Sequence, residues 1–170
     1  VPTVAPTPLP GDPTLSPVPD PTFSPTYTLE LPYSLELVNF TGRSAYCPNY
    51  PLTSYQKISD TEGGFTGTLD NDDNFGISVS AIGDVNNDGV VDLAVGAYRD
   101  DDGGGDRGAV YILFLNTDGT VKSHQKISDT EGGFTGVLDN DDYFGASVSA
   151  MGDVNNDGVV DLAVGALYDD

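Results

Sequence analysis

The chain has 170 residues, with 6 Lys and Arg against 27 Asp and Glu, and a formal net charge of −21. Such a charge repels phosphate backbones and anionic lipid surfaces, which excludes nucleic acid as a partner. No apolar run approaches the roughly 20 residues that a membrane helix needs, so no membrane span is predicted in this chain.

Proline dominates the first part of the chain, since ten of the twelve prolines precede Tyr33. A segment this rich in Pro and Thr buries too little apolar surface to offset its chain entropy. We therefore predict a disordered linker or stalk over residues 1–32. The sequence leaves two alternatives open for residues 33–55, a spacer or a degenerate first repeat unit.

An internal repeat with a period of 69 residues occupies the rest of the chain. Residues 56–101 and 125–170 differ at only six of 46 aligned positions. A period of this length is typical of repeat arrays, in which each unit buries its apolar face against its neighbours. We therefore predict a repeat region over residues 56–170, with copies that start at Gln56 and Gln125.

The repeat is predicted to form β-strands, because its apolar residues alternate with a period of two and do not follow helical spacing. Val91, Leu93 and Val95 are expected to share one face of the second strand. The segment Asn116-Thr117-Asp118-Gly119 is a strong hairpin signal between the third and fourth strands. The four predicted strands of the first copy lie at residues 75–82, 91–97, 108–115 and 121–127.

Four short antiparallel strands per repeat are typical of a β-propeller blade, so the predicted fold class is all-β. The chain has room for one complete four-stranded blade and partial ones, whereas a closed propeller takes about four to eight blades. We therefore expect an incomplete ring that belongs to a larger protein. Further repeats of the same protein are its expected neighbours.

The most informative motif is Asp84-Val85-Asn86-Asn87-Asp88-Gly89-Val90-Val91-Asp92, which recurs unchanged at residues 153–161. Oxygen side chains at positions 1, 3 and 5 converge when the chain turns tightly, and Gly at position 6 permits that turn. The last acid stands at position 9, whereas an EF-hand carries Glu at position 12, where this chain has Val95. The motif therefore predicts a calcium loop that joins two strands.

Each loop offers four oxygen-bearing side chains and one backbone carbonyl, which suits calcium better than the tighter octahedron of magnesium. We predict about two Ca²⁺ sites, whose ions relieve repulsion among crowded carboxylates and so stabilise the repeats. A metal-free Asp/Asn/Gly turn is the alternative. The predicted ligands are Asp84, Asn86, Asp88, Val90 and Asp92 in the first copy and Asp153, Asn155, Asp157, Val159 and Asp161 in the second.

Around these loops the sequence resembles FG-GAP repeats, the units of the integrin α-subunit N-terminal β-propeller. Phe75-Gly76 and Phe144-Gly145 match the FG part. Gly96-Ala97-Tyr98 and Gly165-Ala166-Leu167 match the GAP part, with Tyr or Leu in place of Pro. The resemblance implies a seven-bladed propeller of four-stranded blades, structural calcium between the first and second strands, and partner contacts from loops of the opposite rim.

The function expected from the motif and the resemblance is an extracellular or cell-surface, calcium-binding FG-GAP repeat segment of a larger adhesion or interaction protein. Its expected partner is a protein or a glycan, and Asn39-Phe40-Thr41 fits the N-glycosylation pattern of a glycoprotein. Two alternatives stay open. One is an architectural repeat spacer of a wall or matrix protein, and the other is an accessory domain of a secreted hydrolase.

No catalytic activity is predicted, because His124 and Cys47 are the only histidine and cysteine and no activated nucleophile is identifiable. The acidic run at residues 70–73 is interpreted as a solvated loop. Residues 100–106, which are rich in glycine, are interpreted as a flexible rim loop and as a candidate for partner contact.

Overall fold

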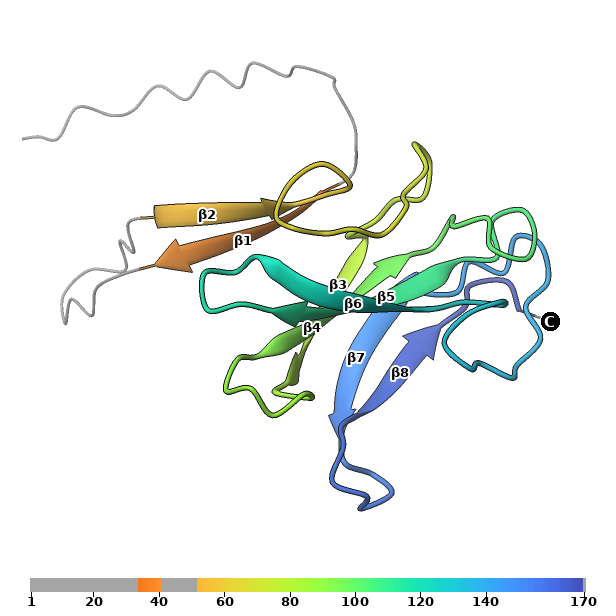
Figure 1. Ribbon diagram of the computed structural model, residues 1–170. Coiled ribbons are helices and arrows are strands. Elements are labelled where there is room, and N and C mark those ends of the chain that lie inside the picture. The colour runs from red at the N-terminus through yellow and green to blue at the C-terminus, as the bar shows by residue number, and fades with distance from the viewer. Residues whose placement is uncertain (1–33, 41–51, 170) are drawn as a thin grey trace, which may run out of the picture. The chain divides into compact units, whose positions relative to one another are not determined.

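The computed structural model of the chain describes residues 34–40 and 52–169, which form eight β-strands and no helix (Figure 1). The predicted all-β class is therefore confirmed. The predicted linker at residues 1–32 and Cys47 lie outside the described residues. The strands are β1 (Leu35–Phe40), β2 (Leu52–Ile58), β3 (Ser78–Gly83), β4 (Asp92–Ala97), β5 (Ala109–Leu115), β6 (Val121–Ile127), β7 (Ser147–Gly152) and β8 (Asp161–Gly165).

One complete four-stranded antiparallel blade is present, with the strand order β3-β4-β5-β6. The predicted hairpin closes it, because Gly119 takes a left-handed φ of 84° and the Asn116 amide donates to the Thr120 carbonyl at 2.8 Å. The fourth strand has the bounds predicted from the sequence. The predicted blade is therefore confirmed.

Three strands begin later than the sequence indicates, and β5 does so by a single residue. The predicted first strand starts at Phe75, whereas β3 starts at Ser78, because Asn74 and Gly76 have left-handed φ values of 56° and 91° and form a turn. Val91 precedes β4 and is 53% exposed. Of the three residues predicted to share the packed face of that strand, only Leu93 and Val95 are therefore buried.

Two partial blades accompany the complete one as the two-stranded sheets β1-β2 and β7-β8. The β7–β8 pair repeats the register of β3–β4, including the irregularity before Gly83 and Gly152. No strand of the described chain pairs with the second edge of β8. The described residues thus form an open set of blades.

The complete blade is buried on both faces, because each partial blade covers one of them. One apolar cluster joins Leu113 of the blade to Leu35 and Ile58 of β1–β2. The other cluster joins Ile112 of the blade to Leu162 of β8. Strands β4 and β5 therefore bury almost every residue, as a sheet packed on both sides must.

Successive units are also joined by polar contacts. The Ser78 hydroxyl donates to the Gly145 carbonyl at 2.7 Å, and the Ala150 amide donates to the Ser80 hydroxyl at 3.0 Å. Both serines lie in β3 and both partners in or beside β7, so the two inner strands stay in register. Within the described part of the chain, no helix is long and apolar enough to cross a membrane.

Candidate functional site

The first aspartate loop connects β3 to β4 and turns as its sequence predicts. The side-chain oxygens of Asp84 and Asn86 both accept the Asp88 amide at 2.9 Å, and Asp84 also accepts the Gly89 amide at 2.8 Å. Gly89 has a φ of 88°, which only glycine adopts without strain. The oxygens of loop positions 1 and 3 therefore converge on one point.

The second loop, between β7 and β8, has the same internal geometry. Asp153 and Asn155 both accept the Asp157 amide at 2.9 Å, and Asp153 accepts the Gly158 amide at 2.8 Å. Gly158 has a φ of 90°. Since the second blade is incomplete, this geometry comes from the nonapeptide itself and not from its surroundings.

The other two carboxylates of the first loop, those of Asp92 and Asp88, contact groups outside the point where Asp84 and Asn86 converge. Asp92 is fully buried, with Oδ2 accepting the Val85 amide and Oδ1 accepting the Leu115 amide, both at 3.1 Å. Asp88 lies 3.0 Å from the Lys122 ammonium, whose hydrogen bond lowers the pKa of that carboxyl below its ordinary value. Among residues 34–40 and 52–169, no three His, Cys, Asp or Glu side chains are grouped to hold a metal ion.

The predicted donor set fits calcium by its chemistry, because all of its atoms are oxygens and three of the side chains can carry charge. Each carboxylate oxygen that accepts one amide retains a second lone pair for an ion. The side-chain oxygens of Asp84 and Asn86 thus lie together, whereas both carboxylate oxygens of Asp92 accept backbone amides. The full ligand set stays a prediction.

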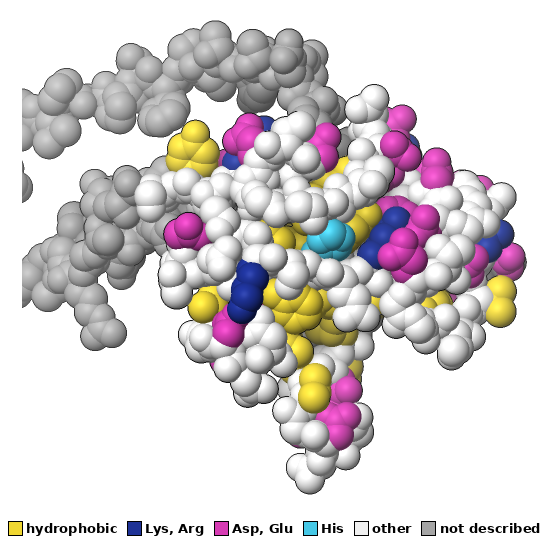
Figure 2. Space-filling view, in the orientation of Figure 1, with side chains coloured by type: hydrophobic (Ala, Val, Ile, Leu, Met, Phe, Trp, Pro, Cys, Tyr) yellow, Lys and Arg dark blue, Asp and Glu magenta, His cyan; other side chains and the backbone are white. Residues whose placement is uncertain are grey.

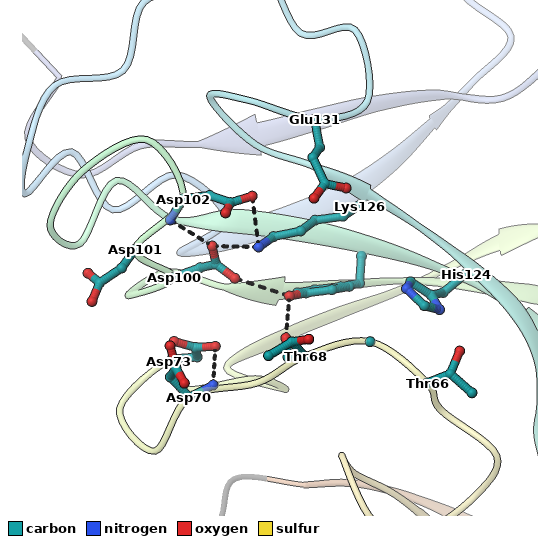
Figure 3. Close-up of a pocket in the computed structure, with 12 residues that line it drawn as sticks. Thr66, Thr68, Asp70, Asp73, Asp100, Asp101, Asp102, His124, Lys126 and Glu131 are labelled. Carbon is teal, nitrogen blue, oxygen red and sulfur yellow. Dashed lines mark hydrogen bonds and ion pairs between the residues drawn. The ribbon is translucent and has the colours of Figure 1, made fainter.

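A second polar region lies on the complete blade, as a cavity of about 430 Å³ between residues 66–73 and the strands β5 and β6 (Figure 3). Figure 2 shows the histidine of this region in cyan, between yellow apolar side chains and a group of charged side chains. The acidic residues that line the cavity are Asp70, Asp73, Asp100, Asp101, Asp102 and Glu131, and its basic residue is Lys126.

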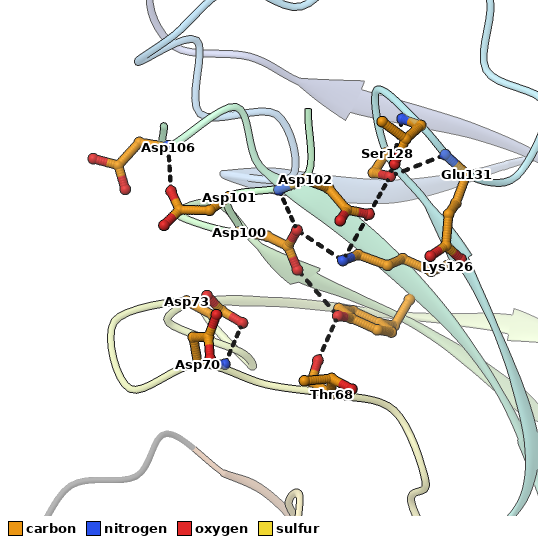
Figure 4. A network of polar contacts seen from close by, with 12 residues as sticks. Thr68, Asp70, Asp73, Asp100, Asp101, Asp102, Asp106, Lys126, Ser128 and Glu131 are labelled. Carbon is orange, nitrogen blue, oxygen red and sulfur yellow. Dashed lines mark hydrogen bonds and ion pairs between the residues drawn. The ribbon is translucent and has the colours of Figure 1, made fainter. Parts of the chain in front are cut away.

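One lysine organises the polar contacts on the strand side of this cavity (Figure 4). The Lys126 ammonium lies 2.8 Å from Asp100 and 2.9 Å from Asp102, and its side chain is only 14% exposed. The Tyr111 hydroxyl donates toward Asp100 at 3.0 Å and toward the Thr68 carbonyl at 3.1 Å. Burial opposes the charge of Lys126, but hydrogen bonds to the two carboxylates raise the pKa of this ammonium.

Asp73 faces the same cavity without a basic partner of its own. Its side chain accepts the Asp70 amide at 2.8 Å and the residue is 5% exposed. Burial, together with the charges of Asp100 and Asp70, raises the pKa of Asp73 to about 6. Burial beside Asp100 also raises the pKa of Tyr111, which keeps its hydroxyl protonated as a donor.

Residues 70–73 were interpreted as a solvated loop and residues 100–106 as a flexible rim loop, and one member of each is buried instead. Asp73 is 5% exposed and Asp100 is 3% exposed. Sequence reasoning missed this cavity because its parts come from four separate segments. The available signal was Lys126, a cation near the end of a predicted strand that needs carboxylate partners when it is buried.

His124 is not part of a catalytic pair among the described residues. Its ring packs on Phe65, with 4.8 Å between the ring centroids, and Phe65 in turn packs on Phe75 at 5.3 Å. Phe65 is 4% exposed. The histidine therefore lines the cavity as an aromatic packing residue.

The chain was also compared with known proteins. The FG-GAP repeat family matches residues 75–113, which include the first aspartate loop, β4 and most of β5. The chain is an FG-GAP repeat protein. It is 34% identical to mouse (Mus musculus) integrin alpha-2 over 118 residues, which is 68% of this chain and 9% of that protein. It is 37% identical to chicken (Gallus gallus) integrin alpha-6 over 95 residues, which is 56% of this chain and 8% of that protein.

This FG-GAP repeat protein therefore resembles the integrin alpha β-propeller, as the sequence motifs predicted. A similar match, 38% identical over 94 residues, is human (Homo sapiens) integrin alpha-11, of which the alignment covers 7%. The chain spans less than a tenth of the length of each of these relatives. The likeness therefore concerns the repeat unit.

Proposed function

We propose that this chain is a calcium-binding FG-GAP repeat segment of a larger extracellular or cell-surface protein that acts in adhesion or interaction. The observation that carries the proposal is the pair of identical strand-connecting loops, in each of which Asp and Asn oxygens converge on one backbone amide. Similarity to integrin alpha chains supports an adhesion-type context. The partner is a protein or a glycan.

Calcium is proposed to be structural in this segment. When bound, the ion supplies positive charge that offsets the carboxylates of each loop. The residues that would hold it are Asp84, Asn86, Asp88, Asp92 and the Val90 carbonyl, with their counterparts in the second copy. Because the first loop joins two core strands, an ion there would lock β3 against β4.

A catalytic role is not part of the proposal. Asp73 has the raised pKa that catalytic acids often show, but its burial beside Asp100 and Asp70 accounts for that value. The lysine that lines the cavity, Lys126, forms ion pairs with the carboxylates of Asp100 and Asp102. The groups of the cavity are therefore used to hold the blade together.

Calcium titration by calorimetry on the chelator-treated chain tests the proposal. We expect about two sites per chain, and at 100 times the dissociation constant each occupied site should add about 2.7 kcal/mol to the free energy of unfolding. Asp84→Asn and Asp153→Asn each remove the charge and keep one of the two side-chain oxygens that accept backbone amides. Each is expected to remove one site, and the double variant both.

The matched control is Asp118→Asn, in the β5–β6 turn, where the carboxylate accepts the Thr120 amide at 2.9 Å outside either loop. This variant should retain both calcium sites. Absence of binding heat in a chain that keeps its β-sheet circular dichroism, with a melting temperature indifferent to chelator, would contradict the proposed function.

A further inference from the structure

One lysine of the complete blade reaches into the first aspartate loop from another element. Lys122 is the second residue of β6, and its ammonium lies 3.0 Å from Oδ2 of Asp88, which precedes it by 34 residues. Because neighbouring antiparallel strands run in opposite directions, the β3–β4 loop and the β5–β6 turn lie at the same end of the sheet. The ion pair therefore joins the loop to the last strand of the blade.

The lysine contacts one particular carboxylate of the loop. Both oxygens of Asp84 and both oxygens of Asp92 accept backbone amides. Asp88 accepts the Val90 amide at 3.0 Å through Oδ1, which leaves Oδ2 to the ammonium. In the described part of the chain, this is the only ion pair that includes a predicted calcium ligand.

The lysine is an addition to the repeat unit. The equivalent position of the β1–β2 hairpin, 69 residues earlier, is Thr53, although the two hairpins have the same strand register. Hairpin pairing thus does not require a cation at this position. Packing does not require it either, because the side chain of Lys122 is 53% exposed. The position of this cation is therefore explained by the loop that it contacts.

Calcium and the Lys122 ammonium compete for the same carboxylate. Asp88 stands at position 5 of the loop and is one of the side chains proposed to hold the ion. An ammonium at hydrogen-bond distance uses a lone pair of this carboxylate and repels a divalent cation placed beside it. Since Lys122 is exposed on a flexible four-carbon stem, its ammonium can move into water when an ion arrives.

In the absence of an ion, the same ammonium offsets part of the repulsion within the loop. Asp84, Asp88 and Asp92 bring three carboxylates into nine residues. The nearby positive charge of Lys122 reduces their mutual repulsion. An ion pair with this exposure contributes little net stability, so its loss on calcium binding costs little.

We propose that Lys122 is a built-in counter-ion of the first aspartate loop, which holds Asp88 in the calcium-free chain and is displaced when calcium binds. This inference rests on the calcium sites proposed above. It makes Lys122 a residue that lowers the calcium affinity of one loop without being a ligand of the ion. Calcium binding between β3 and β4 then also releases a side chain of β6.

Calcium calorimetry on the full chain tests the inference with one loop silenced at a time. The Asp153→Asn chain keeps the first loop as its calcium site. In that chain, Lys122→Met removes the ammonium and keeps an unbranched side chain. We expect it to tighten calcium binding about threefold to tenfold at about 0.1 M salt, because a cation close to the ion is removed. The gain should shrink at about 1 M salt, where the screening length is about 3 Å.

Three comparisons separate this effect from a general change of charge. In the Asp84→Asn chain, which keeps the second loop, Lys122→Met should leave the calcium affinity unchanged. Lys122→Arg keeps the positive charge and should bind calcium with nearly the parent affinity. Lys57 pairs with Glu62 at 3.4 Å outside either loop. Lys57→Met therefore makes the same charge change elsewhere and should not alter the affinity of the first loop.

Chemical labelling tests the displacement itself. An amine-reactive acetylating reagent modifies a lysine that is free in water faster than one that is held in an ion pair. Peptide mass spectrometry of the Asp153→Asn chain should show faster acetylation of Lys122 with calcium than with chelator. The rate at Lys57 should be the same in both conditions.

The outcomes separate this inference from the proposed function. If Lys122→Met leaves calcium affinity unchanged or weakens it, or if calcium does not alter the labelling of Lys122, the inference is overturned while the calcium sites stand. Absence of calcium binding in the parent chain overturns both. Circular dichroism checks that each variant keeps its β-structure, which is expected for changes at an exposed side chain.

Discussion

At the scale of single residues, identical side chains acquire different roles from their surroundings. Asp92 and Asp161 end identical nonapeptides, yet Asp92 is fully buried whereas Asp161 retains part of its exposure. Asp73 is buried beside other carboxylates, and its pKa is raised from 3.8 to about 6. A buried acid with such neighbours makes the stability of the folded chain depend on pH.

Asp73→Asn should therefore stabilise the chain at neutral pH. The folded chain holds a proton on Asp73 between about pH 4 and 6 that the unfolded chain has lost, so its contribution to stability falls as pH rises through this window. We expect the variant to gain about 3 kcal/mol in unfolding free energy at pH 7.5 and almost nothing at pH 4. Urea unfolding followed by circular dichroism at several pH values measures this.

The matched substitution is Asp142→Asn, at the same turn of the second copy, where Asp142 accepts the Asp139 amide at 2.6 Å. No counterpart of Tyr111 covers that turn among the described residues, so a smaller gain is expected there. Two outcomes would contradict the view that burial beside Asp100 makes the Asp73 carboxylate destabilising. One is an equal stability gain in both variants, and the other is a gain of Asp73→Asn that persists at pH 4.

At the scale of strands, repetition of a sequence does not repeat its packing. Gly96 in β4 and Gly165 in β8 occupy the same position of the repeat. A Cβ atom on Gly96 would overlap the carbonyl oxygen of Gly145, a backbone atom that cannot move aside. On Gly165 it would overlap only the hydroxyl of Ser147, the end of a side chain that can rotate.

Gly96→Ala and Gly165→Ala therefore form a matched pair for the contact between blades. We expect Gly96→Ala to cost about 2 kcal/mol of unfolding free energy, because overpacking pushes β4 from the turn before β7. Gly165→Ala should stay within about 0.5 kcal/mol of the parent chain. Thermal and urea unfolding of both variants measure the difference in unfolding free energy. If both variants lose the same free energy, the close backbone contact is not specific to Gly96.

At the scale of the whole molecule, charge opposes compaction. The chain carries 27 acidic and 6 basic residues. The ion pairs recorded among its described residues use Lys57, Arg107, Lys122 and Lys126. Most carboxylates therefore have no cation beside them, and their mutual repulsion is larger in the folded chain than in the extended one.

Added salt should consequently stabilise the calcium-free chain. Raising NaCl from about 0.01 M to 0.1 M shortens the screening length from about 30 Å to 10 Å, so repulsion across the molecule is reduced. We expect a higher urea midpoint at the higher salt concentration. The effect should shrink at pH 4, where fewer carboxylates are ionised, and a midpoint that is independent of salt would contradict this account.

Much of the fold was accessible from local patterns in the sequence. The alternation of Leu93 and Val95, the turn at Asn116 to Gly119 and the 69-residue repeat predicted the blade. The first two features depend on backbone preferences within a few residues. The convergence of Asp84 and Asn86 followed from the nonapeptide for the same reason. By contrast, the start of β3 at Ser78 was missed, because Asn74 and Gly76 turn the chain with left-handed φ values inside a segment whose alternating apolar residues already indicated a strand.

The sequence by itself determined the all-β class, the repeat period and the turn geometry of both aspartate loops, because short-range conformational preferences decide each of them. Only the tertiary structure decided that Asp73, Asp100 and Lys126 share one cavity, and that two copies of one sequence differ in burial. Those outcomes depend on which strands pack against each unit. Asp92 is buried because β5 covers its strand, and Asp161 remains partly exposed because no described strand covers β8.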